Sequence, residues 1–194
     1  MKATVYEKPG DVELKEVPKP EIKTANDAII KVVRACVCGS DLWFYRGIHE
    51  FYRPGTVVGH EAIGIVDSVG ENVKNVKPGD FVIVPFTHGC GHCVACKNGF
   101  DSNCLNSNFA SGITTGYQAE YLRTENASWA LVKIPGQPKD YSDAQLNDLL
   151  TLADVMATGY HAAASAEVKD GETVAVASVV SSVPSCAVPS GSSS

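Results

Sequence analysis

Residues 89–104 read GCGHCVACKNGFDSNC, and this short stretch places Cys90, Cys93, Cys96 and Cys104 on one loop. Zinc in structural sites takes four ligands in a tetrahedron, and gaps of two residues let successive sulfurs point at one centre. The three glycines of the stretch give the backbone the freedom that such a tight loop requires. Four thiolates leave no open coordination position, so we predict a structural rather than a catalytic zinc site.

The cellular compartment bears on the alternatives to a metal site, which are disulfides, a redox pair or an unmetallated reactive loop. The N-terminal residues MKATVYEKPGD have no apolar signal core, and no apolar run approaches the ~20 residues of a membrane span. We therefore expect a cytoplasmic protein without a membrane partner, where clustered cysteines are more often ligands than disulfides. His88 and His92 lie beside four sulfurs that already complete the coordination, so we interpret both as bystanders.

The composition is that of an ordinary globular protein, with 44% hydrophobic and 20% charged residues among 194. This length fits one domain, or one domain and part of a second. The formal net charge is −6, and Lys and Arg do not cluster. Because nucleic-acid binding needs concentrated positive charge, we exclude a nucleic-acid partner, including one bound by a zinc ribbon.

Short apolar runs rich in β-branched residues predict strands and turns up to about residue 135. The clearest runs are residues 27–37 (DAIIKVVRACV), 62–69 (AIGIVDSV), 77–84 (KPGDFVIV, which opens with a Pro-Gly turn) and 116–122 (GYQAEYL). Helical patterns begin at Ser142, with residues 142–152 and 154–167, and residues 169–176 (KDGETVAV) predict a turn and a new strand. We expect one domain over residues 1–141, linker helices and the start of a second domain over 142–180, and an irregular Ser/Pro-rich tail over 181–194.

Two further motifs hold candidate metal ligands. CGSD at residues 38–41 and GHEAIGIV at residues 59–66 each place a cysteine or histidine near a carboxylate. Three protein ligands leave a fourth position for water or substrate, which is the arrangement of catalytic zinc. Taken separately, the motifs also fit a simpler interpretation, in which Cys38 is a buried apolar thiol and His60 a packed or surface residue.

Together, CGSD, GHE and C-x2-C-x2-C-x7-C resemble, in this order and at these distances, the zinc-dependent medium-chain alcohol dehydrogenases. Phe86-Thr87 resembles a pair that lines the substrate pocket in that family, GYQAEY its G-x-x-A-E-Y strand, and MATGYHAA the segment that enters its cofactor domain. The resemblance covers about residues 1–176. It implies a mainly β fold: a GroES-like, partly open β-barrel catalytic domain with a structural-zinc lobe, then helices and the first strand of an incomplete Rossmann domain.

The resemblance also implies a second, catalytic zinc. It places two ligands at Cys38 and His60 and a third at Asp154, where liver-type members carry a cysteine and formaldehyde-dehydrogenase-like members an aspartate. Glu61 corresponds to a carboxylate that coordinates the metal when water leaves; the alternative is that it only orients the ligands. Asp41 corresponds to the carboxylate that fixes the imidazole of His60.

Ser40 corresponds to the hydroxyl that receives the substrate's proton, with a simple turn residue as the alternative, and His49 is a candidate for passing that proton to solvent. Trp43, Phe44 and Phe86 are expected to wall an apolar substrate pocket, although core packing explains Trp43 and Phe44 equally well. The implied reaction interconverts a small alcohol and an aldehyde or ketone, with zinc polarising the substrate oxygen and hydride passing to NAD or NADP.

The sequence departs from the family where the cofactor should bind. No glycine stands between Gly171 and Gly191, whereas the family has G-x-G-x-x-G after this strand, so that the pyrophosphate can approach a helix N-terminus. We therefore expect a catalytic-domain portion that is inactive alone, whether from a truncated or frameshifted gene or as an engineered or partial form. The alternative is a genuine short protein, a non-catalytic zinc-binding GroES-like module. The family forms dimers or tetramers through the missing domain, which leaves a homo-oligomer open.

Overall fold

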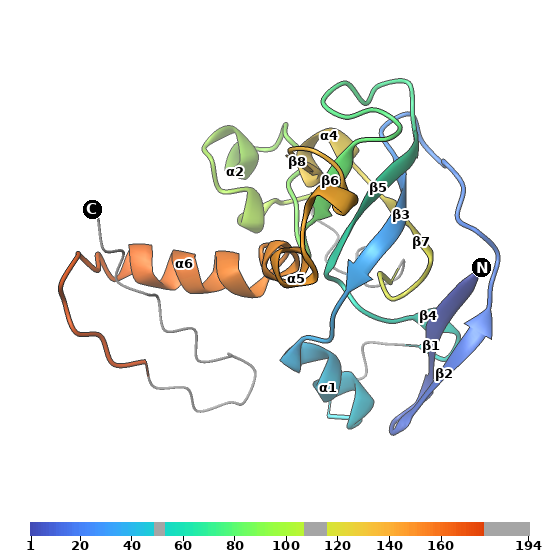
Figure 1. Ribbon diagram of the computed structural model, residues 1–194, viewed down its shortest axis with the longest axis horizontal. Coiled ribbons are helices and arrows are strands. Elements are labelled where there is room, and N and C mark those ends of the chain that lie inside the picture. The colour runs from blue at the N-terminus through green and yellow to red at the C-terminus, as the bar shows by residue number, and fades with distance from the viewer. Residues whose placement is uncertain (49–52, 107–115, 177–194) are drawn as a thin grey trace.

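The computed structural model describes residues 1–48, 53–106 and 116–176, which form a mainly β structure with helices at its margins (Figure 1). The strands form two antiparallel sheets. The three-stranded sheet has the order β2 (Asp11–Glu16), β1 (Lys2–Lys8), β4 (Thr56–Val57). The five-stranded sheet has the order β7 (Tyr121–Thr124), β3 (Ala28–Ala35), β5 (Ala62–Val69), β6 (Phe81–Val84), β8 (Val132–Ile134). The predicted mainly β fold is confirmed.

The centre of the five-stranded sheet is the antiparallel pairing of β3 with β5, in which Ala28 lies opposite Val69. Both strands are rich in β-branched residues, which pack well on a pleated surface. Gly64 is required in β5 because a Cβ at this position would lie 2.5 Å from Ile30 Cγ2. Buried side chains of this sheet form the main core, among them Ile30, Val66, Val82, Val84 and Leu122.

Short helical segments connect the strands, and two longer helices follow them. The short segments are α1 (Gly39–Tyr45), α2 (Val94–Lys97), the 3-10 helix η1 (Asp101–Asn103), α4 (Ala127–Ala130) and the 3-10 helix η2 (Pro138–Asp140). The longer helices are α5 (Asp143–Thr151) and α6 (Val155–Ser165). Within the described ranges, none of the helices has the length and apolar character needed to cross a lipid bilayer.

Helix α5 packs on the five-stranded sheet. Ser142 is its N-cap and accepts a hydrogen bond from the Gln145 N–H at 3.3 Å, in agreement with the helix predicted over residues 142–152. The two buried leucines of α5 belong to a second core cluster with residues of β5, β6 and β8. The division of the chain at residue 141 stays a prediction.

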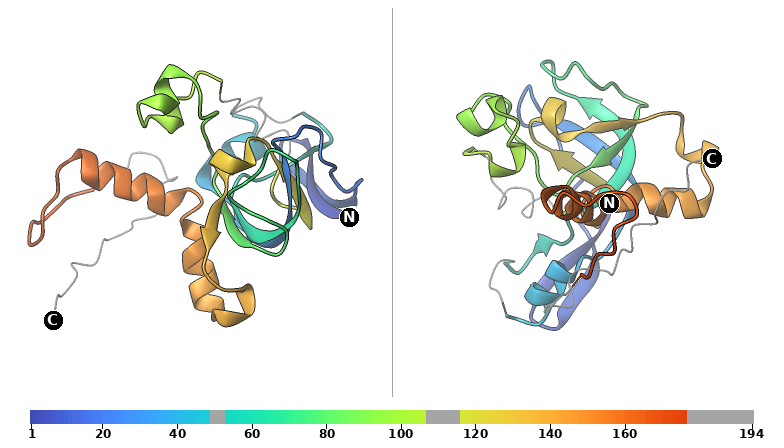
Figure 2. Two further views of the ribbon diagram at one scale, coloured as in Figure 1. Left: turned by 90° about the horizontal axis from the view of Figure 1, so that it is seen from above. Right: turned by 90° about the vertical axis from the view of Figure 1, so that its left-hand side faces the viewer.

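Helix α6, in contrast, carries no buried side chain. It extends away from the two sheets, toward the left in Figure 1 and in the left view of Figure 2. Its sequence VMATGYHAAAS contains no Asp, Glu, Lys or Arg, and Met156 and Tyr160 are 44% and 74% exposed. A helix of this composition normally buries a face, so among the described residues α6 lacks the cover that its sequence calls for.

The new strand predicted after α6 does not form. Residues 172–176 (ETVAV) have no regular secondary structure, and all five are exposed. A parallel strand is stable when it is buried between neighbours, and this segment pairs with neither sheet of the described structure.

Candidate functional site

The four cysteines of residues 89–104 converge in a lobe built from α2 and η1. The Sγ–Sγ distance is 4.0 Å between Cys90 and Cys96, 3.5 Å between Cys93 and Cys96, and 3.8 Å between Cys93 and Cys104. Zinc–sulfur bonds of about 2.3 Å in a tetrahedron place the sulfurs about 3.8 Å apart. The donor set therefore fits a zinc ion in chemistry and in spacing. No disulfide forms among the cysteines that the structure describes.

Hydrogen bonds within the lobe favour the thiolate form of Cys90. Its Sγ accepts from the Cys93 N–H at 3.4 Å and from Asn106 Nδ2 at 3.3 Å. Burial alone would raise the pKa of Cys90, but these donors and the His92 N–H lower it to about 5. Metal ligation requires a deprotonated sulfur, so these contacts prepare the loop for a cation. The rings of His88 and His92 face backbone carbonyls at 3.4 and 2.9 Å, and neither joins the four sulfurs.

A second cluster brings together Cys38, His60, Glu61 and Asp154, whose ligand atoms all lie within 4.8 Å of one another. Cys38 is the N-cap of α1, His60 and Glu61 stand just before β5, and Asp154 is the N-cap of α6. Asp154 Oδ2 lies 3.6 Å from Cys38 Sγ and 3.5 Å from His60 Nε2. These spacings equal the edges of a coordination tetrahedron with sulfur, nitrogen and oxygen ligands.

Glu61 supplies an independent indication that this cluster suits a cation. Its side chain is 1% exposed, and neither carboxylate oxygen has a hydrogen-bond partner among the described residues. Burial raises the pKa of Glu61, as do the nearby Asp154 and Asp41, while the Cys36 thiol and His60 act in the opposite direction. A thiol is only a weak donor, so this buried carboxylate is costly unless a positive charge stands beside it, and His60 Nε2 lies 3.8 Å away. A zinc ion bound here would supply that positive charge.

The imidazole of His60 is oriented from behind by Asp41. Asp41 Oδ1 lies 3.4 Å from His60 Nδ1, and Asp41 Oδ2 accepts a hydrogen bond from the Cys38 N–H at 2.9 Å. Burial would lower the pKa of His60, but Asp154, Asp41 and Cys38 outweigh it and raise this pKa to about 12. The surroundings thus favour positive charge at the imidazole. Ser40 Oγ lies 3.5 Å from His60 Nε2, the ring nitrogen that faces Asp154.

The predicted pocket residues are only partly gathered around this cluster. The ring of Phe86 lies edge-on to His60, with centroids 6.3 Å apart. Trp43 and Phe44 belong to α1, and Phe44 packs against a small core cluster of Tyr6 and Val58. His49 lies outside the described residues.

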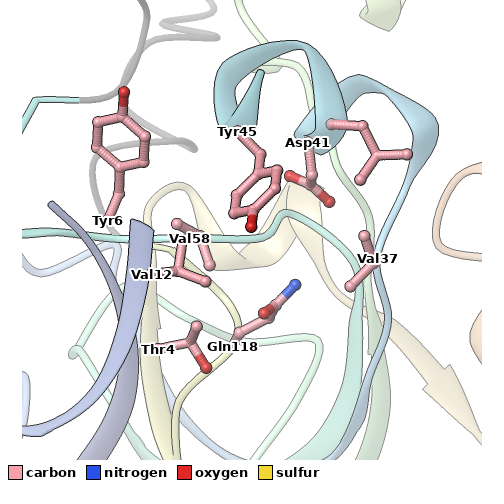
Figure 3. A pocket seen from close by; sticks show the side chains of 9 residues that line it. Thr4, Tyr6, Val12, Val37, Asp41, Tyr45, Val58 and Gln118 are labelled. Atoms are coloured by element: carbon pink, nitrogen blue, oxygen red, sulfur yellow. The ribbon is translucent and has the colours of Figure 1, made fainter. Parts of the chain in front are cut away.

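A cavity of about 200 Å³ adjoins the site on the side of Asp41 (Figure 3). Its lining residues are Thr4, Tyr6, Val12, Val37, Asp41, Leu42, Tyr45, Val58 and Gln118. Asp41 is the one member of this lining that the sequence motifs had marked as a site residue. The cavity therefore borders on Asp41, which orients His60, and none of the four candidate metal ligands lines it.

Sequence reasoning missed two side chains that contact these clusters. Asn106 donates to Cys90 Sγ, and Gln118 donates to the Cys36 carbonyl close to Cys38. Gln118 falls inside the GYQAEY motif, which was noticed for its likeness to a strand. The role of its side chain depends on residues 36 and 118 lying close together in the folded chain, and sequence spacing gives no indication of this contact.

Comparison with known proteins gives consistent results. Residues 24–136 match the family model "Alcohol dehydrogenase GroES-like domain". The zinc-type alcohol dehydrogenase-like protein AdhB of Bacillus subtilis is 41% identical over 188 residues, covering 91% of this chain and 49% of that protein. The glutathione-independent formaldehyde dehydrogenase of Pseudomonas aeruginosa is 36% identical over 192 residues, covering 91% and 47%.

Solved structures give the same result. The alcohol dehydrogenase TADH from Thermus sp. ATN1 superposes with a TM-score of 0.79 and 32% identity, over 88% of this chain and 49% of that one. The chain thus spans about half the length of the relatives it matches. The fold and the order of the motifs agree with these matches, so the predicted resemblance is confirmed: the chain belongs to the zinc-type medium-chain alcohol dehydrogenases, whose GroES-like domain it contains.

Proposed function

We propose that this chain is the zinc-binding, catalytic-domain portion of an oxidoreductase that interconverts alcohols with aldehydes or ketones, with hydride transfer to NAD or NADP. One observation carries the proposal: Cys38, His60, Glu61 and Asp154 come from three distant segments and converge to within 4.8 Å. A thiol, an imidazole and a carboxylate with one further carboxylate beside them form a set that suits catalytic rather than structural zinc.

Cys38, His60 and Asp154 would hold the metal, and Glu61 would approach it as an exchangeable ligand. A zinc ion bound there supplies Lewis-acid polarisation of the substrate oxygen. The chain's own residues do the rest. Asp41 holds the His60 ring from the Nδ1 side, so that Nε2 faces the cluster. His60 and Glu61 are buried, which limits the access of bulk water to these two side chains.

Ser40 would accept the proton that leaves the substrate hydroxyl, since its Oγ lies 3.5 Å from His60 Nε2 at the edge of the cluster. His49 is the proposed next acceptor on the way to solvent. Phe86, whose ring stands edge-on to His60, would form one apolar wall of the substrate pocket, and Trp43 another. A small, uncharged alcohol or carbonyl compound is the substrate class that such walls accept.

The four-cysteine lobe would hold a second, structural zinc ion, because four sulfurs at 3.5–4.0 Å complete a tetrahedron without an open position. The nicotinamide site has no counterpart in the described residues. The relatives are about twice as long, and α6 exposes an uncharged surface, so we propose that the cofactor binds mainly to a part that corresponds to the unmatched half of these relatives. We therefore infer that the chain does not turn over alone.

A chimera tests the proposal directly. Residues 1–165 of this chain replace the corresponding half of the Bacillus subtilis relative, and oxidation of short alcohols is followed by NAD(P)H absorbance. We expect zinc-dependent turnover that Cys38→Ala abolishes. A folded chimera that binds two zinc ions but oxidises or reduces no alcohol, aldehyde or ketone would contradict the proposed activity.

The second candidate, a non-catalytic zinc-binding module, is favoured by the missing strand at residues 172–176. Titration of the zinc-loaded chain with NADH, followed by cofactor fluorescence, separates the two. Saturable micromolar binding would contradict our inference that the chain alone lacks a cofactor site. Without such binding, the chimera decides between a dehydrogenase portion and a module.

A further inference from the structure

Gln118 stands where three parts of the chain meet. Its backbone N–H donates to the Val58 carbonyl at 2.9 Å, and its own carbonyl accepts from the Thr4 N–H at 2.8 Å. The next residue, Ala119, forms a β-bridge with Ala3. The backbone of Gln118 is thereby held between β1 and the segment that leads into the second metal-ligand cluster.

The side chain of Gln118 reaches two of the three segments that carry cluster residues. Its Nε2 donates to the Cys36 carbonyl at 3.1 Å, two residues before Cys38. Its Cγ lies against Gly59, the residue before His60, so closely that a Cβ at Gly59 would lie 2.6 Å from it. Gly59 has φ +87, a conformation that side-chain-bearing residues rarely adopt. The glycine thus permits both the turn and the contact with Gln118.

We propose that Gln118 is a positioning residue for the metal centre: it fixes the segment of Cys38 relative to the segment of His60. This inference rests on the proposed role of Cys38 and His60 as zinc ligands. The amide contacts neither ligand atom. It fixes the backbone on which each ligand stands, and a tetrahedral site tolerates little change in the separation of its ligands.

The cavity beside Gln118 leaves room for a substitution that removes the amide contact. Gln118 and Asp41 both line it, so the side chain faces about 200 Å³ of open space rather than a packed wall (Figure 3). Asp41 joins the same two segments through the Cys38 N–H and His60 Nδ1, and β3 pairs with β5 at Ala35 and Ala62, so the Gln118 amide adds to these contacts. The same space accommodates a side chain of similar length, so substitution by methionine removes the donor without overpacking.

Gln118→Met is the informative variant, and Gln137→Met is its matched control. Gln137 Nε2 also donates to a backbone carbonyl at 3.1 Å, that of Gly79. Neither Gln137 nor Gly79 belongs to one of the two metal-ligand clusters. Zinc affinity is measured by chelator competition on the 194-residue chain. Two zinc-binding steps are expected, one for each cluster. The step that Cys38→Ser weakens or removes is the one that belongs to the Cys38–His60–Asp154 centre. Cobalt substitution then gives the visible absorption of that centre.

We expect Gln118→Met to weaken zinc binding at the Cys38–His60–Asp154 centre about tenfold or more and to shift its cobalt spectrum, as is typical when a group supporting a ligand is lost. The four-cysteine step should not change, and Gln137→Met should change neither step. Gln118→Glu, which keeps the length but has no donor, should weaken the same step.

Two outcomes overturn the inference, and they differ. If the unsubstituted chain binds zinc at the four cysteines alone, the proposed catalytic site fails and the role of Gln118 fails with it. If both steps are present and Gln118→Met matches Gln137→Met in affinity and cobalt spectrum, the site stands and Gln118 is not its positioning residue.

Discussion

Asp27 is a buried charge outside the two clusters. Its carboxylate is 1% exposed and accepts hydrogen bonds from the Lys23 and Thr24 N–H groups, the Thr24 hydroxyl and Arg123 Nη1, all at 2.7–3.0 Å. Arg123 lies near the end of β7 and Asp27 directly before β3, so this pair ties the start of β3 to the end of its antiparallel neighbour. Its removal should therefore affect the whole sheet.

We expect Asp27→Ala to lower the free energy of unfolding by about 3–5 kcal/mol, because it leaves Arg123 without its buried partner. Glu125→Ala is the control: Glu125 also contacts Arg123, at 2.7 Å, but its side chain is 39% exposed, so about 1 kcal/mol or less is expected. Urea denaturation monitored by circular dichroism measures both. Equal losses in the two variants would refute the importance of burial here.

The same carboxylate gives a pH dependence with a defined sign. Burial alone would raise the pKa of Asp27, but Thr24, the Lys23 N–H and Arg123 outweigh it and lower this pKa below its ordinary value. The unfolded chain therefore takes up the proton first as pH falls. Stability from Asp27 is complete above the unfolded pKa of about 3.9 and is lost as pH falls through the lower folded value.

Unfolding free energies of the wild type and Asp27→Ala, measured between pH 6 and pH 2.5, test this dependence. Groups other than Asp27 contribute to both proteins, so the difference between the curves isolates it. We expect that difference to be constant above about pH 5 and to shrink below about pH 3.9. A difference that grows on acidification contradicts the lowered pKa.

At the scale of single elements, the four-cysteine lobe depends on few contacts besides its sulfurs. One of them joins it to α4: a Cβ at Gly91 would lie 1.9 Å from Trp129 Nε1, so the indole covers the backbone of Gly91. Gly91 has φ +78, and its lack of a side chain allows both this backbone conformation and the contact. The indole is thus placed to report on the order of the lobe.

Removal of the metal from the lobe should loosen this contact, since a small metal site contributes its binding free energy to folding. In a Trp43→Phe background, where Trp129 is the remaining tryptophan, we expect chelation to shift its emission to longer wavelength by several nanometres. Zinc should restore it. An emission maximum that does not move on full zinc removal would show that the lobe keeps its structure without metal.

Elements differed in how far the sequence predicted them. Residues 62–69 coincide with β5, because a compact β-branched run between turns had one interpretation. Residues 116–122 alternate like a strand, yet β7 is Tyr121–Thr124. Tyr117 and Gln118 instead bond to the backbone of Gly59 and Val58, and such distant pairings leave no periodic trace in the sequence.

The candidate site shows the same division. Cys38, His60 and Asp154 could be named from motif order, and the structure brings them together. The support from Gln118 could not be named, because it depends on which backbone approaches which side chain after folding. Trp43 and Phe44 illustrate a third case, where aromatic composition alone leaves pocket and core equally plausible.

In the molecule as a whole, burial is concentrated in the sheets, and the C-terminal part of the described chain is exposed. Ala28, Ile30 and Ala62 at the centre of the five-stranded sheet are fully buried, while α6 and residues 166–176 are exposed almost throughout. Apolar side chains such as Met156 and Tyr160 therefore meet water without contributing to the stability of this chain.

Substitution of both residues tests this distribution. We expect Met156→Lys with Tyr160→Lys to change the free energy of unfolding by about 0.5 kcal/mol or less, since neither side chain is buried. Binding of an apolar dye such as ANS should decrease, and solubility should rise. The matched double variant Leu146→Ala with Leu150→Ala, in buried positions of α5, should cost several kilocalories per mole. A comparable loss in both double variants would show that α6 is covered.

One feature of the metal centre has a mechanical consequence. Asp154 belongs at once to the ligand cluster and to the N-cap of α6, and its neighbour Ala153 is tied to Phe86 by a backbone hydrogen bond of 3.1 Å. An ion held between Asp154, Cys38 and His60 would fix the N-terminal end of α6 relative to the two sheets. Its presence would set the direction in which α6 leaves the sheets.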